Sequence, residues 1–168
     1  ETDINLNSIK NISQATFVER NDIHPLQPFA GDIIHEGRWS NSIRFGSTNK
    51  TINLGTSSNN WSFNGTTGDP ITIIRNGQPS NSTDEGWKHI TEKIQEDLSS
   101  IYLTSYQSIP LSPSSENYRS FNTPPTSVSL FTNPQIIFNS NRIVINAKTD
   151  SVLLSAQNSV NLSTNKSV

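Results

Sequence analysis

Carboxylate side chains come first among the residues that could do chemistry, because glycoside hydrolysis needs two of them at a defined separation. No spacing in the sequence pairs any two of the candidates, which are Glu36, Asp69, Asp84 and Glu85. Acyl transfer would need an activated hydroxyl, and although serines are abundant, the chain holds no GxSxG motif. The sequence therefore predicts no catalytic residues and a protein that is not an enzyme.

Histidine chemistry and metal binding are the next possibility. His24, His35 and His89 stand apart in the sequence, and neither an HExxH motif nor a zinc-deaminase motif is present. Glu19, Asp22 and His24 lie within one short segment, but their spacing matches no specific metal site. We therefore expect no metal site and no cofactor.

The composition of the chain is polar but weakly charged. Of its 168 residues, 31% are hydrophobic and 15% are charged. A chain that is instead rich in Ser, Asn and Thr is typical of extracellular fibrous β-proteins. The formal net charge of −2 gives no electrostatic reason to bind nucleic acid or an acidic membrane, and there is no cysteine for a disulfide. Because the chain starts at Glu1, we expect a processed chain or a piece of a longer one.

The C-terminal residues 127–168 repeat with a period of eight, as SVSLFTNP, QIIFNSNR, IVINAKTD, SVLLSAQN, SVNLSTNK and SV. The second position of each octad is β-branched and apolar, and these residues are Val128, Ile136, Val144, Val152, Val160 and Val168. The fourth position is apolar in four octads of five, and its residues are Leu130, Phe138, Asn146, Leu154 and Leu162. Polar or turn-forming pairs close each octad. The regularity predicts a repeat architecture.

An octad suits a short strand better than a helix. In a helix, equivalent positions would drift by about 80° per octad, whereas in a strand positions two and four face the same side. Two apolar residues per repeat and two unpaired strand edges cannot close a core within one chain, so several copies must wind together. The eleven octad residues above would then form a trimer core, with Asn146 as a polar layer that fixes register. A single-chain β-solenoid or a simple meander is the alternative.

The rest of the chain divides into an arm, a barrel and a linker. Residues 1–30 are weakly periodic and hold two prolines, so we expect an arm that touches a neighbour. Residues 112–126 are rich in Pro and Ser and are expected to be a linker. Between them, alternating apolar residues and glycine turns predict a small barrel over 31–111, with strands at 31–37, 42–46, 51–55, 71–75 and 101–105. A helix is expected over 85–98, where Ile90, Ile94 and Leu98 would form an apolar face.

A C-terminal β-ribbon of octads resembles the intertwined trimeric β-helix of the central spike in contractile phage tails. The family octad carries a Val, as here, and a Gly, which this chain lacks. Members of that family place a five-stranded OB-like barrel before the β-helix. The segment GDIIHEGRWSNSIRFGS resembles the first strand pair of this barrel, which carries an inward Arg-Phe pair, and GDPITIIRNGQ and SSIYLTSYQSIPL resemble segments of baseplate hub proteins.

The resemblance implies an all-β fold, with a small OB-like barrel followed by an intertwined trimeric β-helix. It also implies a structural virion protein of the tail baseplate, a spike or hub that contacts or penetrates the host cell envelope. The implied partners are two further copies of the chain, other tail or baseplate proteins and a tip protein at the C-terminal end, without nucleic acid. Relatives with a lysozyme domain carry it between barrel and β-helix, where the linker here leaves no room.

Two other functions remain open at this point. A carbohydrate- or receptor-binding fibre module would stack sugars on exposed aromatic rings, for which the candidates are Trp39, Trp61, Tyr102 and Tyr106. A bacterial adhesin fragment would fold its octads as a single-chain solenoid. A nucleic-acid-binding barrel face is disfavoured, because acidic residues lie among the basic and aromatic candidates Arg38, Trp39, Arg44, Phe45, Trp61 and Phe63.

Overall fold

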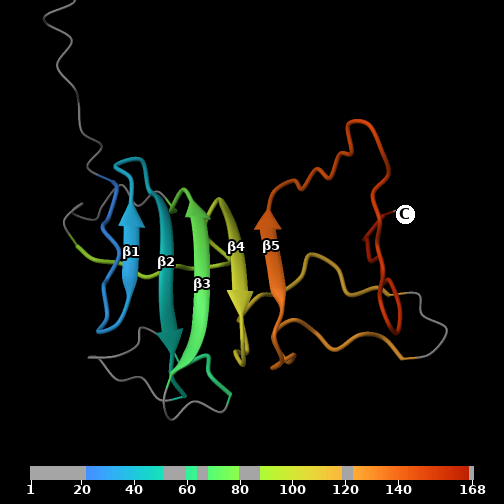
Figure 1. Cartoon of the computed structure of the whole chain (residues 1–168), viewed down its shortest axis with the longest axis horizontal. Coiled ribbons are helices and arrows are strands. Elements are labelled where there is room, and N and C mark those ends of the chain that lie inside the picture. Colours follow the sequence, from blue (N-terminus) through green and yellow to red (C-terminus); the bar gives the residue numbers. More distant parts are fainter. Residues whose placement is uncertain (1–21, 51–59, 64–67, 80–87, 119–122, 167–168) are drawn as a thin grey trace, which may run out of the picture.

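The protein is all-β, and its strands form one antiparallel sheet (Figure 1). The computed structural model describes residues 22–50, 60–63, 68–79, 88–118 and 123–166. Its strands are β1 (Ile33–Glu36), β2 (Asn41–Thr48), β3 (Asp69–Asn76), β4 (Ser99–Thr104) and β5 (Ile136–Ser140). The predicted all-β class is confirmed. Most of the expected arm, the expected strand at 51–55 and Val168 lie outside the described residues.

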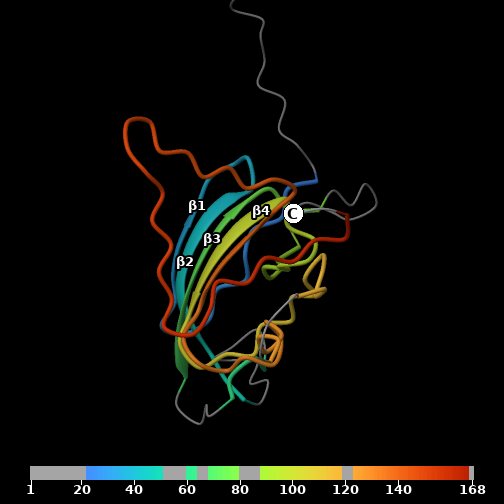
Figure 2. The same ribbon diagram turned by 90° about the vertical axis from the view of Figure 1, so that its right-hand side faces the viewer.

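The sheet is a meander in which every strand pairs with its neighbour in the chain, in the order β1-β2-β3-β4-β5. Among the described strands, β1 and β5 stand at opposite edges, so the sheet is open rather than closed on itself (Figure 1). Figure 2 shows that the sheet is strongly curved, with the connecting segments gathered on its concave side. The strands expected near 31–37, 42–46, 71–75 and 101–105 are all present.

Alternation of side chains gives the sheet two faces of different character. The core lies on the concave face, where Ile71, Ile73, Tyr102 and Ile137 are buried. The connecting segments close this core with Ile94, Ile109 and Leu111. Two of these connecting residues belong to the segment that follows β4, so the chain folds back over its own sheet.

The turns that end the strands depend on backbone geometry. β3 ends at Asn76, and Gly77 has a φ of +77°, where a side chain would be strained. Its amide donates to the Ser40 carbonyl, which ties the end of β3 to the turn between β1 and β2. Ser40 itself has a φ of 63° and its hydroxyl accepts from the Gln78 amide. These contacts hold the end of β3, from which the chain continues into a long connection rather than directly into β4.

The helix predicted over 85–98 is wrong for the part the structure describes, residues 88–98, which form turns and an isolated bridge. Ile90 pairs with the backbone near Leu26, and the Lys93 amide donates to the Asp97 carboxylate. Ile94 is buried, whereas Leu98 is exposed, so the spacing never produced one apolar face. Tertiary pairing with residues near Leu26 satisfied backbone groups that a helix would have used. The described residues contain no helix long and apolar enough to cross a membrane.

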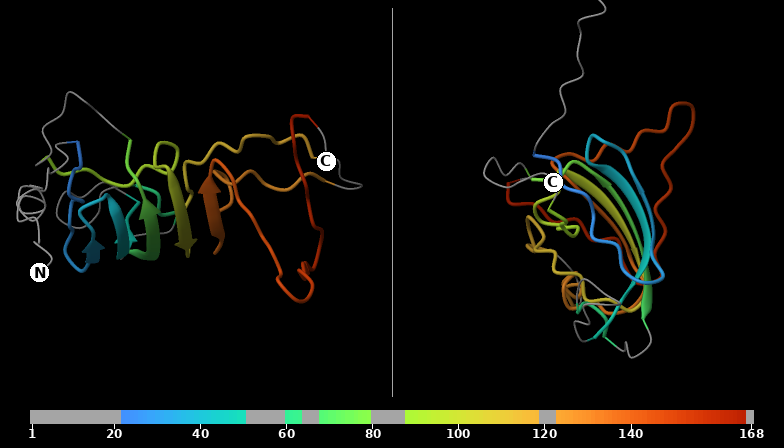
Figure 3. Two further views of the ribbon diagram at one scale, coloured as in Figure 1. Left: turned by 90° about the horizontal axis from the view of Figure 1, so that it is seen from above. Right: turned by 90° about the vertical axis from the view of Figure 1, so that its left-hand side faces the viewer.

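The second octad supplies the last strand of the sheet. β5 lies within the octad range and pairs antiparallel with β4. The remaining described octads, over 141–166, contain no strand and extend beyond the β5 edge (Figure 3). There they run beside the linker, where Asn117 donates to Asn165 and the Ser115 and Ser163 hydroxyls share a hydrogen bond. The octad region thus begins inside the sheet rather than after it.

Candidate functional site

The octad side chains predicted to form a trimer core are mostly on the surface of the single chain. The exposed ones, in octad order, are Leu130, Ile136, Phe138, Val144, Asn146, Val152, Leu154, Val160 and Leu162. Exposure reaches 76% at Val144 and 68% at Leu154. Val128 differs, because it is partly buried against the core beneath the sheet. Exposure of a regular series of mostly apolar side chains to water is unfavourable in free energy, so this segment is a candidate assembly surface.

β5 shows which way the octad positions face. Ile136 and Phe138, at positions two and four, both point away from the core, whereas Ile137 between them is buried. In the register with β4, Ile136 lies opposite Leu103 and Phe138 opposite Ile101. The expected common orientation of positions two and four therefore holds in this strand.

The outer face of the sheet, meaning the face opposite the core, carries further apolar side chains across all five strands. One row runs through cross-strand partners His35, Ile43, Ile74, Ile101 and Phe138. The next row runs through Ile33, Phe45, Thr72, Leu103 and Ile136. The octad positions of β5 complete both rows.

A groove of about 690 Å³ runs across this outer face and is lined by residues of all five strands. Its apolar lining comes from Ile43, Ile74, Ile101 and Phe138 of the sheet and from Ile143 of the third octad. Views from both sides show the chain after β5 leaving on the outer side of the sheet (Figures 2 and 3). The groove therefore joins the outer face to the octad segment.

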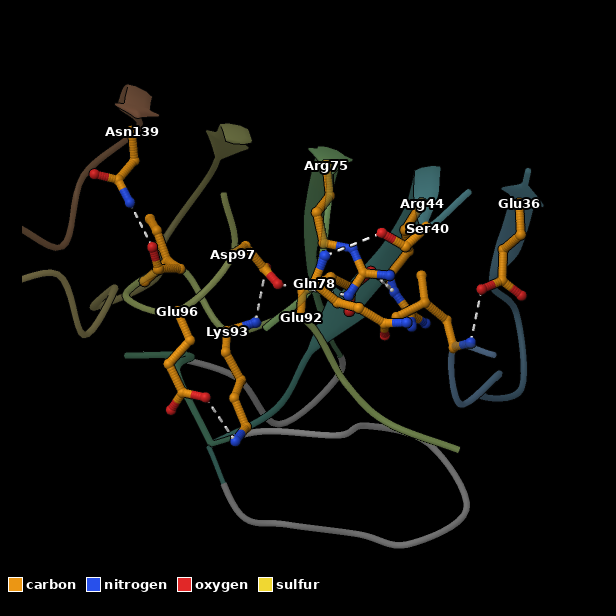
Figure 4. Close-up of polar contacts among 12 residues, drawn as sticks. Glu36, Ser40, Arg44, Arg75, Gln78, Glu92, Lys93, Glu96, Asp97 and Asn139 are labelled. Carbon is orange, nitrogen blue, oxygen red and sulfur yellow. Dashed lines mark hydrogen bonds and ion pairs between the residues drawn. The ribbon is translucent and has the colours of Figure 1, made fainter. Parts of the chain in front are cut away.

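The opposite, inner face holds a buried ionic cluster that sequence reasoning missed (Figure 4). Arg44 donates to the carboxylates of Asp32 and Glu92, with 2.7 Å between its Nε and Glu92 Oε1. It also donates to the Gln27 carbonyl, which ties the segment before β1 to the sheet. Burial alone would lower the pKa of Arg44, but the two carboxylates raise it above its usual value. The guanidinium therefore stays charged and ties two connecting segments to the sheet, the one before β1 and the one between β3 and β4.

A second buried ion pair lies beside the first. Arg75 Nη1 is 3.5 Å from Asp97 Oδ1, and both side chains are almost completely buried. Burial raises the pKa of Asp97 to about 6, against the opposing effect of Arg75. The neighbouring Tyr102 hydroxyl is buried too, and burial together with the Asp97 charge raises its pKa. A sequence signal existed for Arg75, which shares its phase with the apolar Ile71 and Ile73, but not for Arg44, which alternates with the apolar Ile43 and Phe45.

The structure corrects two expectations about aromatic and basic residues. Arg44 is buried whereas Phe45 points outward, so the Arg-Phe pair is not jointly inward and cannot form a common nucleic-acid face. Tyr102 is completely buried and Trp61 packs against it, with 6.2 Å between ring centroids. Of the four aromatic residues considered for sugar stacking, Trp39 and Tyr106 remain exposed.

The candidate catalytic and metal-binding residues that the structure describes are not brought together. Glu36 accepts a hydrogen bond from the Leu26 amide, and His24 Nδ1 lies 2.9 Å from the Lys88 carbonyl oxygen. Asp84 and Glu85 lie outside the described residues. Among the described residues, no three His, Cys, Asp or Glu side chains are placed to share a metal ion.

Comparison with protein-family models, with curated proteins and with solved structures finds no match to this chain. Its function is therefore inferred from its own residues and their arrangement.

Proposed function

We propose that this chain is a structural protein of a contractile phage tail, where three copies form a spike or hub at the baseplate. In this proposal the curved sheet belongs to an OB-like barrel, and the octads of three chains wind into a β-helix. The observation that carries it is the exposure of the octad positions two and four, repeated every eight residues from Leu130 to Leu162.

Burial of these positions would drive the assembly. Each octad offers up to two apolar side chains, and full burial of a Val or Leu contributes on the order of 1.5–3 kcal/mol before entropy is deducted. The octads over 141–166 contain no strand within the chain, so their backbones have no ladder partner there and could pair with strands from other copies. A β-ribbon shared by three chains would both bury these side chains and pair these backbone groups.

The proposed role is mechanical. In an intertwined rod no chain can unfold alone, which gives the stiffness and kinetic stability needed in a part that is pushed against a cell envelope. The sheet would dock on other tail or baseplate proteins, and the octads would point toward the host or hold a tip protein. Catalysis, a cofactor and nucleic acid have no part in this role.

The alternatives are less well supported by the surface. A single-chain solenoid would turn positions two and four into its own interior, yet they are exposed after the second octad. A sugar-binding module would need a shared aromatic platform, and burial of Tyr102 removes one of its members.

The mass of the full chain in solution tests the proposal. Light scattering should give three times the chain mass of 18.6 kDa. Antibodies against the chain should then label the distal end of contractile tails from its source. A chain that stays monomeric at high concentration, or labelling elsewhere on the particle, would contradict it.

A further inference from the structure

We propose that the outer face of the sheet is itself an interface with neighbouring copies of this chain, continuous with the octad surface. This inference rests on the proposed trimer and extends its contact from the C-terminal rod to the sheet. In the assembly the apolar outer faces would turn toward the other copies, and the segment-covered concave faces would turn outward.

The distribution of polarity across the sheet is the first observation. The outer row Ile43, Ile74 and Ile101 is apolar, whereas its neighbours on the inner face include Arg44 and Arg75. The charged side chains of the central strands are thus turned toward the covered side, where they pair with buried carboxylates. An outer face exposed to water would favour the reverse arrangement, since buried charges need partners and exposed isoleucines gain nothing.

The size of the apolar patch is the second observation. Its large members are between 37% and 63% exposed, and they are Ile33, Ile43, Phe45, Ile74, Leu103, Ile136 and Phe138. At about 200 Å² for a fully exposed large side chain, these residues leave on the order of 700 Å² in water. The largest patch on a typical monomer is ~300–600 Å², and a standard interface buries ~800 Å² per partner. The outer face is therefore large enough to be an interface.

Continuity identifies the partner as another copy. Ile136 and Phe138 belong to the outer face through their register with β4 and to the octad series through their positions two and four. Phe138 and Ile143 also line the same groove as Ile43, Ile74 and Ile101 of the outer face. If other copies cover the octads, they reach β5 and with it the adjoining rows of β4 and β3.

Single cysteines can test this interface, because the natural sequence contains none. In the full chain, Phe45→Cys reports on the outer face and Leu154→Cys on the octads. The matched control is Glu96→Cys, which replaces an exposed side chain in a connecting segment away from the outer face. Each variant is treated with a maleimide in its native state and after denaturation, and its native mass is measured in parallel.

The expected result is a trimer in which both Phe45→Cys and Leu154→Cys react roughly tenfold or more slowly than Glu96→Cys. Rapid labelling of Phe45→Cys in a trimer that protects Leu154→Cys would overturn the interface but leave the proposed function standing. Rapid labelling of both in a monomer would remove both proposals. Protection of Phe45→Cys in a monomer would also overturn the interface, because a segment of the same chain would then cover the face.

A second reporter keeps the test decisive if Phe45→Cys fails to fold. Thr72→Cys replaces a smaller side chain than Phe45→Cys does, and Thr72 lies between Phe45 and Leu103 in the same outer row. In the trimer, the cysteine of this variant should react with maleimide roughly tenfold or more slowly than in its own denatured state. Unhindered reaction of Thr72→Cys in a folded trimer would refute the interface.

Discussion

Replacing Val152 and Leu154 together by asparagine should dissociate the proposed trimer. These residues are 48% and 68% exposed in the single chain. With ~1.5–3 kcal/mol for complete burial of such a side chain, the exposed fractions correspond to about 1–2 kcal/mol each, or ~2–4 kcal/mol per chain. Three chains would lose ~6–12 kcal/mol of association free energy, a factor of about 10⁴–10⁹ in the association constant.

Sedimentation or light scattering over a range of concentrations would measure this change. The matched control is Leu153→Asn, because Leu153 is 87% exposed and lies at position three, which should face away from a trimer core. The control should remain a trimer, whereas the double variant should be a monomer whose sheet is still folded, as shown by a cooperative urea unfolding transition. A double variant as tightly assembled as the natural chain would refute the reasoning, as would equal effects at position three.

Three further predictions concern the sheet. Folding raises the pKa of Asp97 from 3.8 to about 6, so the free energy of unfolding should fall by ~3 kcal/mol as pH rises between these values. Urea unfolding measured across this pH range should show the fall in the natural chain and not in Asp97→Asn. Gly77→Ala should lower the free energy of unfolding by ~1–3 kcal/mol, because Gly77 has a φ of +77°. Gly31→Ala should lower it less, since a Cβ at Gly77 would lie 2.5 Å from a leucine side chain whereas a Cβ at Gly31 would meet open space. Equal losses of stability in urea unfolding would contradict this. A chain ending at Arg142 keeps β5 and should unfold cooperatively in urea, whereas a chain ending at Thr126 lacks β5 and should lose its cooperative unfolding transition. Cooperative unfolding of both chains would contradict this.

Much of the sheet was predictable from local pattern. The strands around Ile43 and Ile73 alternate buried and exposed residues, and a period of two in side-chain direction leaves little choice of structure there. The octad spacing likewise predicted that Ile136 and Phe138 face one side. These features depend only on residues that are close together in the sequence.

The failures came where distant residues compete for the same groups. The segment from Ile90 to Leu98 has helical spacing, but pairing of Ile90 with the backbone at Pro25 and Gln27 gives its polar groups other partners. Tyr102 was considered as an exposed sugar-stacking residue, yet it is the centre of the core. Neither outcome can be read from a window of a few residues.

The sequence by itself determined the period of the octads. It also determined the strand character of β2, β3 and β4 and the shared face of Ile136 and Phe138, because both follow from the alternation of side chains along a strand. Only the tertiary structure decided that β5 belongs to the sheet and that Arg44 and Arg75 point to the covered side. It also decided that the apolar outer rows meet the octad positions at Ile136 and Phe138. Those facts depend on strand register and on carboxylates from distant segments, which place charges and apolar surfaces only once the chain has folded.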